Sequence, residues 1–220
     1  MHKADIRLIN EEFYADAVLP EQMDKLWADG WRHFGTHFYR YNFGIYEFDV
    51  RRVIPLRIRL SEFSCSRNQR RIIGKNADLT GLISPIKITP AAEAMFERHK
   101  LRFDHGVPDS IYDFLSLCPE KEPCEAKQLS VYSDARLVAE SYFDFGNKAV
   151  SGIYAMFEPE FASRSLGIFT MLKEIEFSIE KGKEFYYQGY SYEGESFYDY
   201  KKRFRGTEAF DWNGRWEKFF

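Results

Sequence analysis

The chain has 220 residues, of which 45% are hydrophobic and 18% aromatic, and its formal net charge is -3 at pH 7. This composition is typical of a globular protein with a sizeable core and excludes an extended disordered chain. No apolar run approaches the roughly 18 residues that cross a bilayer, and the N-terminus lacks the apolar core of a signal peptide, so we expect a cytoplasmic protein. The three cysteines are odd in number and include no C-x-x-C pair, which argues against a disulfide framework and against a cysteine-rich zinc site.

The first half of the chain is predicted to contain both strands and helices. Residues 33–43 alternate aromatic and polar side chains and residues 52–60 alternate apolar side chains with arginines, which predicts two strands. Pro55 then marks a sheet edge or a bend. Proline starts, capping residues and glycine stops predict helices at residues 20–29, 67–76, 90–103 and 110–117.

Basic residues are concentrated in one stretch. From Arg51 to Lys75 there are eight Lys or Arg residues and one acidic residue, Glu62, so the rest of the chain is acidic. Such a stretch can present a patch to a polyanion. The alternative is a set of ordinary solubilising side chains on strand and helix surfaces.

A proline-containing segment at residues 118–127 is the predicted boundary between an N-terminal region, 1–120, and a C-terminal half, 121–220, which we expect to pack as one compact unit. Three strands follow it, the last two joined by a Gly146–Asn147 hairpin turn. An amphipathic helix and a strand complete an α+β order in which a helix leaves the end of a sheet and returns to it. The predicted ranges are 128–133, 137–145 and 149–157 for the strands, 163–181 for the helix and 184–190 for the last strand.

Gly167 stands in the first turn of the amphipathic helix, at a cost of roughly 1 kcal/mol in helix propensity. Backbone N–H groups of a first turn bind anions, so this glycine opens the backbone to a ligand; close packing against a strand is the alternative. The spacing of Arg164 and Gly167, R-x-x-G, resembles the pyrophosphate loop of the GCN5-related acyltransferase fold. That resemblance implies a mixed α+β sheet flanked by helices with an N-terminal α/β extension, but Phe169, where acyl-CoA enzymes of that fold carry a small residue, argues against coenzyme A.

The motifs together resemble the arginyl- and leucyl-tRNA protein transferases over most of the chain. In the first half, GWRHFGTHFYR and the run from Gln69 to Asn76, QRRIIGKN, match that family's patterns. In the second half the matching positions are, in order, Asp144, Ser151 and Tyr154, Glu158 and Pro159, Ser165 to Gly167, Tyr186, Gly189 and Tyr190, and Tyr200 with Lys201. Cysteines that family members carry after the Y-R opening, where they bind a metal or cluster, are absent from this sequence.

The resemblance implies aminoacyl transfer. The N-terminal amine of a protein or peptide would attack the ester of an aminoacyl-tRNA, with Arg or Leu as the amino acid moved. It implies no cofactor and, without the cysteines, no metal; the partners would be the charged tRNA and the acceptor, with no membrane. The alternatives are a CoA-dependent N-acyltransferase of the same fold and a catalytically inactive relative that binds tRNA or peptide.

The resemblance also places candidate catalytic residues. Asp144 is the first candidate for orienting or deprotonating the amine and Glu174 the second, while Lys201, beside Tyr200, would pair with a terminal phosphate or the developing alkoxide. Two structural alternatives remain open: Asp144 caps the neighbouring turn, and Glu174 pairs with a lysine on the helix surface.

The remaining candidates would bind RNA. Trp31, Tyr39 or Tyr187 could stack on an unpaired terminal base. We expect the histidines to be structural or on the surface: His2, His33, His37, His99 and His105. The residues expected at the tRNA 3′ end are Arg164, Ser165, Leu166, Gly167, Gly189 and Tyr190. Those expected at the tRNA backbone are Arg57, Arg59, Gln69, Arg70 and Arg71.

Overall fold

The computed structural model describes residues 7–103 and 106–219, and a large mixed sheet runs through it. Its strands are β4 (Phe43–Tyr46), β5 (Asp49–Arg59), β6 (Thr80–Pro85), β7 (Ala126–Ser133), β8 (Arg136–Phe145), β9 (Ala149–Phe157), β10 (Phe185–Tyr192), β11 (Thr207–Phe210) and β12 (Trp216–Lys218). Their order is β12–β11–β5–β10–β9–β8–β7–β6, with β4 paired to β5. Neighbours in this sheet are antiparallel except β9 and β10, which are parallel.

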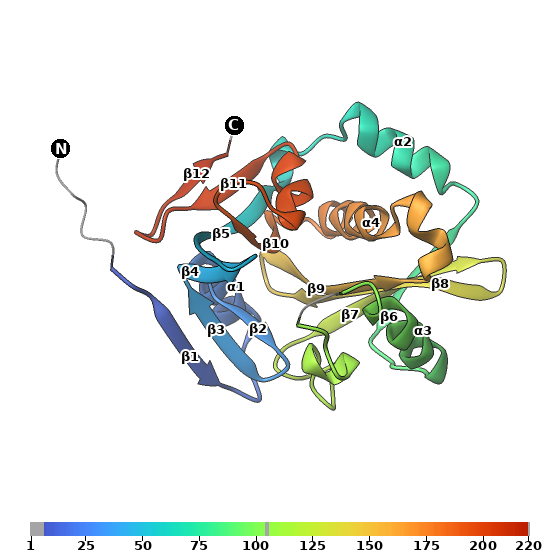
Figure 1. Ribbon diagram of the computed structural model, residues 1–220, viewed down its shortest axis with the longest axis horizontal. Helices are drawn as coiled ribbons and strands as arrows, with labels where there is room; N and C mark the ends of the chain where they lie inside the picture. Colours follow the sequence, from blue (N-terminus) through green and yellow to red (C-terminus); the bar gives the residue numbers. More distant parts are fainter. Residues whose placement is uncertain (1–6, 104–105, 220) are drawn as a thin grey trace.

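Helices cover both faces of this sheet (Figure 1). One face carries α4 (Leu166–Glu180) and, beyond it, α2 (Arg67–Lys75). The other face carries α3 (Pro90–Lys100) and α1 (Pro20–Ala28), together with a small sheet of β1 (Asn10–Tyr14), β2 (Arg32–Phe34) and β3 (His37–Tyr41) in the order β1–β3–β2. None of the helices in the described residues has the length and apolar character needed to cross a bilayer.

Burial of apolar side chains explains this layering. Leucine and aromatic residues recur along α4 at helical spacing, so one stripe of the helix packs on the sheet. The opposite face is covered by two smaller clusters, one under α3 and one under α1. Representative buried members of the three clusters are Leu166, Phe169, Ile175, Phe143 and Tyr186 under α4; Met95, Phe96, Tyr142 and Met156 under α3; and Met23, Trp27 and Tyr187 under α1.

The predicted α+β class is confirmed, with several local corrections. Residues 33–43 form most of a hairpin, β2 and β3, rather than one strand, because Gly35 turns the chain with a φ of +52°. The helix predicted at 110–117 is reduced to a short 3-10 turn, Ile111–Asp113. Pro55 lies in an inner strand, opposite Tyr190 of β10 and just beyond the part of β5 that pairs with β11. Strands β5 and β6, which precede residue 120, share the sheet with the later strands; the boundary at 120 stays a prediction.

Candidate active site

The parallel strands β9 and β10 pair briefly and then separate. Their pairing ends at Tyr187 and Ser151, and β10 continues along β5 after a register shift between Tyr187 and Gly189. Residues 152–155 of β9 are partly exposed even though β9 is an inner strand. We call residues 152–155 and 188–190 the β9–β10 divergence. Predicted site residues lie around it on both faces of the sheet.

On the face that carries α1, Asp144 forms a buried ion pair with His33. Nε2 of His33 lies 2.8 Å from Oδ2 of Asp144, and Nδ1 lies 2.9 Å from the carbonyl oxygen of Gly35. Because a carbonyl oxygen only accepts, Nδ1 carries a proton. The carboxylate of Asp144 favours a second proton on Nε2, which makes the imidazole ring positively charged. Burial opposes this charge, but Asp144 outweighs it and the pKa of His33 lies above its usual value.

Asp144 does not cap the β8–β9 turn. That turn is held by Asp24 of α1, whose carboxylate accepts from the backbone N–H groups of Lys148 and Ala149. The structural alternative for Asp144 is therefore wrong, and its carboxylate pairs with His33 instead. The Sγ atom of Cys124 lies in the same cluster: donor atoms of His33, Cys124 and Asp144 are all within 4.8 Å of one another, and in the described part of the chain this is the group that could hold a metal ion.

On the α4 face, Glu174 lies beneath the sheet and away from solvent. Ser141 of β8 and Tyr186 of β10 each donate a hydroxyl hydrogen bond of 2.5 Å to its carboxylate. Burial raises the pKa of Glu174 to about 7, despite the opposing effect of these two bonds. The alternative of a surface pair with a lysine is wrong, since Lys173 pairs with Glu176 instead.

Gly152 connects this buried carboxylate to the divergence. A methyl group at Gly152 would lie 2.8 Å from the hydroxyl oxygen of Tyr186 and 3.6 Å from Oε2 of Glu174. The missing side chain thus leaves room for a hydroxyl–carboxylate pair directly beside the partly exposed strand. A carboxyl group whose pKa lies near neutrality, next to a site of strand separation, is suited to accept a proton.

Lys201 and Tyr200 lie on a 3-10 turn, Phe197–Arg203, that packs on β10. Nζ of Lys201 donates to the carbonyl oxygen of Tyr190 at 3.1 Å, and Gly189 approaches it so closely that a methyl group there would lie 3.3 Å away. Burial, then the charge of Arg32, lower the pKa of Lys201 to about 8. Tyr200 interacts electrostatically with Glu174, and burial raises its pKa to about 12.

The start of α4 differs from its sequence-based description. Ser165 is the N-cap residue in a left-handed conformation, with φ of +57°, and its hydroxyl makes no capping bond. Leu166 is fully buried, so that residue offers only its backbone. A methyl group at Gly167 would meet Phe157 at 3.8 Å, an ordinary contact, so packing does not require glycine. Arg164 fastens this turn to the end of α2, where it donates to the carbonyl oxygen of Lys75 at 2.8 Å, and it pairs with Asp78 just beyond that helix.

Strand β5 does not present a free arginine face. Arg57 and Arg59 both pair with Glu208 of β11, at 2.6 and 2.8 Å, and the guanidinium of Arg57 lies between the rings of Phe185 and Trp216. Its side chain is buried, which speaks against a contact with RNA.

Helix α2 carries the remaining basic surface. Gln69 is buried and its side chain caps α2 by accepting from the N–H of Ser66 at 2.8 Å, which also speaks against a role in RNA binding. The basic side chains of this helix are exposed, and Lys75 reaches the carbonyl oxygen of Ser163 at 2.6 Å, close to the start of α4. The exposed set is Arg67, Arg70, Arg71 and Lys75.

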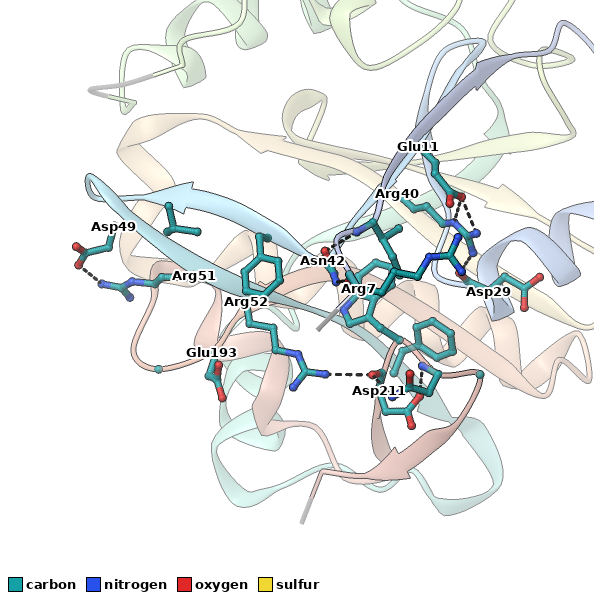
Figure 2. Close-up of a pocket in the computed structure, with 18 of the residues that line it drawn as sticks. Arg7, Glu11, Asp29, Arg40, Asn42, Asp49, Arg51, Arg52, Glu193 and Asp211 are labelled. Atoms are coloured by element: carbon teal, nitrogen blue, oxygen red, sulfur yellow. Dashed lines mark hydrogen bonds and ion pairs between the residues drawn. The ribbon is translucent and has the colours of Figure 1, made fainter. Parts of the chain in front are cut away.

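A groove of about 1460 Å³ lies away from this region, along β4, β5 and the loop after β11. Figure 2 shows its arginines facing acidic groups, as in the pair of Arg40 with Glu11. Arg51 contacts Asp49 at 3.8 Å, and Arg52 donates to the carbonyl oxygen of Asp211. Acidic residues outnumber the arginines in the lining, so the groove is poorly suited to a polyanion.

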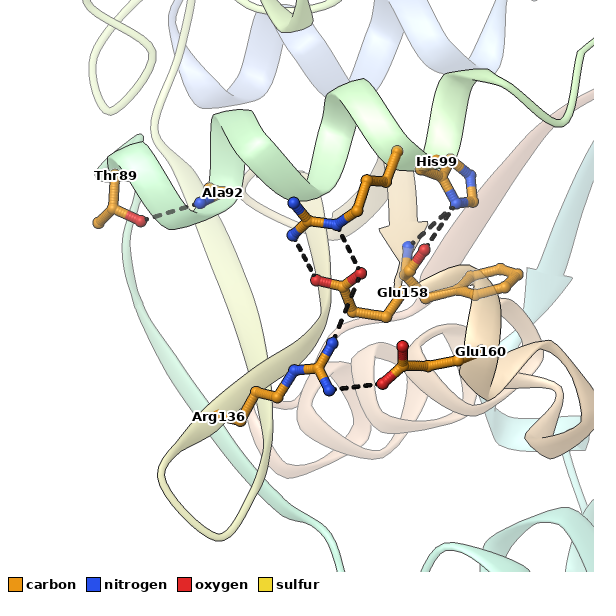
Figure 3. A network of polar contacts seen from close by, with 8 residues as sticks. Thr89, Ala92, His99, Arg136, Glu158 and Glu160 are labelled. Atoms are coloured by element: carbon orange, nitrogen blue, oxygen red, sulfur yellow. Dashed lines mark hydrogen bonds and ion pairs between the residues drawn. The ribbon is translucent and has the colours of Figure 1, made fainter.

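Glu158 anchors the end of β9, just before the chain enters α4. Arg98 of α3 binds its carboxylate through two nitrogens, at 2.6 and 2.9 Å, and Arg136 approaches at 3.9 Å (Figure 3). These bonds, led by Arg98, keep the pKa of Glu158 below its usual value. Glu158, which precedes Pro159 in the sequence motif, therefore has a structural role: it ties the end of β9 to α3.

Comparison with known families decides what kind of protein this is. Residues 92–211 match the family described as "Arginine-tRNA-protein transferase, C terminus". The chain belongs to the arginine-tRNA-protein transferase family. An aspartate/glutamate leucyltransferase of Marinobacter nauticus is 28% identical over 98% of this chain and 89% of its own length. A protein of the same name from Xanthomonas euvesicatoria pv. vesicatoria is 28% identical over 74% of this chain and 70% of its own length.

The structure of FemX has the same fold as this transferase. It matches with a TM-score of 0.52 over 91% of this chain and 69% of its own length, at 11% sequence identity. At that identity the match concerns the fold alone. The predicted α+β architecture, a mixed sheet flanked by helices, is confirmed.

Sequence reasoning about this transferase missed the groups that pair with its candidate residues. His33 and Arg32 lie inside the GWRHFG motif, but neither was assigned to the site; Cys124 was read only as part of a boundary segment. Tyr186 appeared in a motif without a role. In the sequence His33 follows Arg32 in the GWRHFG motif, but only the fold brings it to Asp144. Two of the histidines expected to be structural or on the surface, His2 and His105, lie outside the described residues.

Proposed function

We propose that the protein transfers leucine from charged tRNA to the N-terminal amine of proteins that begin with Asp or Glu. The family assignment supports aminoacyl transfer, and the names of the relatives support the donor and the acceptor. The observation that carries the proposal in the structure is the Glu174–Tyr186 pair beside the β9–β10 divergence, since a proton acceptor must lie where the amine is held.

The proposed reaction at the β9–β10 divergence is the transfer of an acyl group from a ribose oxygen to an amine. The nitrogen of the acceptor, as a neutral amine, forms a bond to the ester carbonyl of the aminoacyl-tRNA, and the bond to the ribose oxygen breaks. The attack leaves this nitrogen as an ammonium in the tetrahedral adduct, and the proton that it loses passes to Glu174 through the hydroxyl of Tyr186. Lys201, with a pKa of about 8, supplies a proton or its charge to the ribose alkoxide.

The tRNA is proposed to lie across α2 with its 3′ end at the start of α4. The exposed basic side chains of α2 and the open backbone at Gly167 support this path, because α2 and α4 are joined there by Lys75 and Arg164. Asp144, held by His33, is proposed to position β2 and β8 rather than to take the proton. The protein would act on N-terminal degradation signals in the cytoplasm.

Three labelled donors test the proposal: leucyl-tRNA, arginyl-tRNA and acetyl-CoA. Each is incubated with a peptide that begins with Asp and with the same peptide acetylated at its N-terminus as a control. Label moving from leucyl-tRNA to the free peptide alone is expected. Label moving only from arginyl-tRNA would correct the donor, label only from acetyl-CoA would overturn the proposal, and salt-sensitive tRNA binding without any transfer would identify an inactive relative.

A further inference from the structure

Arg32, on β2, is a buried guanidinium without a carboxylate partner. Its side chain is 6% exposed, and its Nη1 donates to the carbonyl oxygen of the preceding residue, Trp31, at 2.5 Å. The Nε and Nη2 atoms are buried and have no hydrogen-bond partner among the described residues. An arginine cannot lose its charge at ordinary pH, so these two donors are left unsatisfied in the absence of a ligand.

Asp144, the carboxylate that interacts with Arg32, does not pair with it. Asp144 interacts with it electrostatically, but the ion pairs of the described residues include none to Arg32. Asp144 instead pairs with His33, the residue that follows Arg32, at 2.8 Å from its Nε2 atom. Burial dominates at Arg32 and lowers its pKa. The guanidinium of Arg32 is therefore a buried positive charge that no carboxylate of the described residues neutralises through an ion pair.

The position of Arg32 coincides with the β9–β10 divergence. Its Cζ atom lies 5.1 Å from the ring centre of Tyr187, the last residue of β10 paired with β9, and 5.6 Å from the ring centre of Tyr190, which lies beyond the separation. The hydroxyl of Tyr190 is fixed by the carbonyl oxygen of Gly30, so that this ring is a rigid wall.

A second cation without a carboxylate lies near Arg32. Lys201 makes no ion pair among the described residues, and its pKa is lowered by burial and then by the charge of Arg32. Two like charges at a place where strands separate, with aromatic rings around them, are suited to bind one small anion. The unsatisfied Nε and Nη2 atoms lie on one edge of the guanidinium, and that edge matches the two oxygens of a carboxylate.

We propose that the Nε–Nη2 edge of Arg32 binds the side-chain carboxylate of the acceptor's N-terminal Asp or Glu. This inference rests on the proposed function and assigns a residue to its acceptor specificity. A tRNA phosphate is the less fitting anion because Arg32 is buried between rings, whereas exposed arginines for the RNA lie on α2. Removal of Arg32 should then affect acidic acceptors and spare their amides.

Kinetics with matched peptides test the proposal. Peptides that differ only in their first residue, Asp, Asn, Glu or Gln, are compared as acceptors for the wild-type protein, Arg32→Gln and Arg32→Lys. We expect the wild type to favour Asp over Asn in kcat/KM by roughly 10- to 100-fold, and Arg32→Gln to bring that ratio close to one by losing Asp transfer while keeping Asn transfer. Arg32→Lys should fall between them, because it keeps the charge without the two-pronged edge.

Arg40→Gln is the matched control. Arg40 also stacks on an aromatic ring, that of Trp31 at 4.8 Å, but its donors are already taken by Glu11 and by the carbonyl oxygen of Asp29. Its Asp/Asn ratio should equal that of the wild type. An unchanged ratio in Arg32→Gln, or a raised KM for charged tRNA with the ratio intact, would overturn the proposal; the second result would assign Arg32 to the tRNA.

A binding measurement separates this inference from the proposed function. Binding of Asp-Ala amide and Asn-Ala amide, measured by calorimetry, requires no transfer; preference for the Asp compound that vanishes in Arg32→Gln supports the carboxylate site even if no donor is used. Equal binding of both compounds by the wild type would contradict it. Should Arg32→Gln melt before assay temperature, the same ratios are read from Arg32→Lys, for which an unaltered Asp preference would count against the proposal.

Discussion

The hydroxyl of Tyr186 lies 2.5 Å from Oε2 of Glu174, so that an inner strand and the helix beneath it share one buried acid. Burial raises the pKa of this acid to about 7. The pair stands where β9 leaves β10, with Gly152 above it. The proposed proton acceptor, Glu174, is therefore also a buried group that titrates near neutral pH.

Glu174 should make folding stability fall as the pH rises. Its folded pKa, about 7, exceeds the ordinary value of 4.5, so its contribution is complete below about pH 4.5 and is lost as the pH rises through about 7. The loss is at most about 3 kcal/mol. Urea unfolding of the wild type and Glu174→Gln between pH 4.5 and 8 measures it: the variant should lack this slope, while Glu176→Gln, on the exposed side of α4, should keep it. Equal slopes in all three proteins would contradict the assignment.

The same substitution should slow transfer. We expect Glu174→Gln to lower kcat by roughly 100-fold, because the amine then lacks its proton acceptor. In the wild type, kcat should decline as the pH falls below about 7 and Glu174 becomes protonated. Single-turnover assays over this pH range are the measurement. A variant with normal kcat and the normal pH profile would remove Glu174 from the reaction.

Gly167 and Gly152 form a matched pair for alanine substitution. A methyl group at Gly167 meets Phe157 at an ordinary 3.8 Å, so Gly167→Ala should fold at least as stably, gaining about 0.5 to 1 kcal/mol in helix propensity, yet raise the KM for charged tRNA. Gly152→Ala meets the Tyr186 hydroxyl at 2.8 Å and should lose about 1 to 3 kcal/mol. Thermal melts and tRNA titrations distinguish them; an unchanged KM in Gly167→Ala would indicate that no ligand approaches α4 there.

The architecture was largely predictable, because it follows from local patterns. The spacing of apolar residues along α4 and the glycine–asparagine turn between β8 and β9 are both visible in the sequence. The site was less predictable, because the residues that pair in it are far apart in the sequence. His33 and Asp144 are separated by more than 100 positions and meet only through the packing of the small sheet. Arg57 was misjudged for the same reason, because nothing near it in the sequence indicates Glu208.

The basic face of α2 should carry electrostatic affinity for tRNA. Arg70→Gln with Arg71→Gln is expected to weaken tRNA binding about 10-fold and to reduce the slope of log K against log salt by about 1 to 2. Arg51→Gln with Arg52→Gln removes the same charge from the acid-rich groove and should have little effect. Filter binding at several salt concentrations provides both numbers, and equal losses in the two double variants would show that net charge alone matters.

Glu158 should contribute to stability through α3. We expect Glu158→Gln to lower the free energy of unfolding by about 1 to 3 kcal/mol at pH 7, because it leaves Arg98 without its carboxylate. The pKa of Glu158 is depressed, so the wild-type advantage is present above about pH 4.5 and is lost as the pH falls through the folded pKa. Glu160→Gln, at an exposed partner of Arg136, should change little. Urea unfolding at pH 7 and pH 3 tests this order, and equal losses in both variants would refute it.

The most direct test of the central claim is mass spectrometry of an acceptor peptide that begins with Asp, after incubation with the protein and leucyl-tRNA. We expect one leucine residue attached to the N-terminal amine, with the peptide acetylated at that amine left unmodified. A peptide that stays unmodified with leucyl-tRNA and with arginyl-tRNA, while the protein is folded and binds tRNA, would contradict the account.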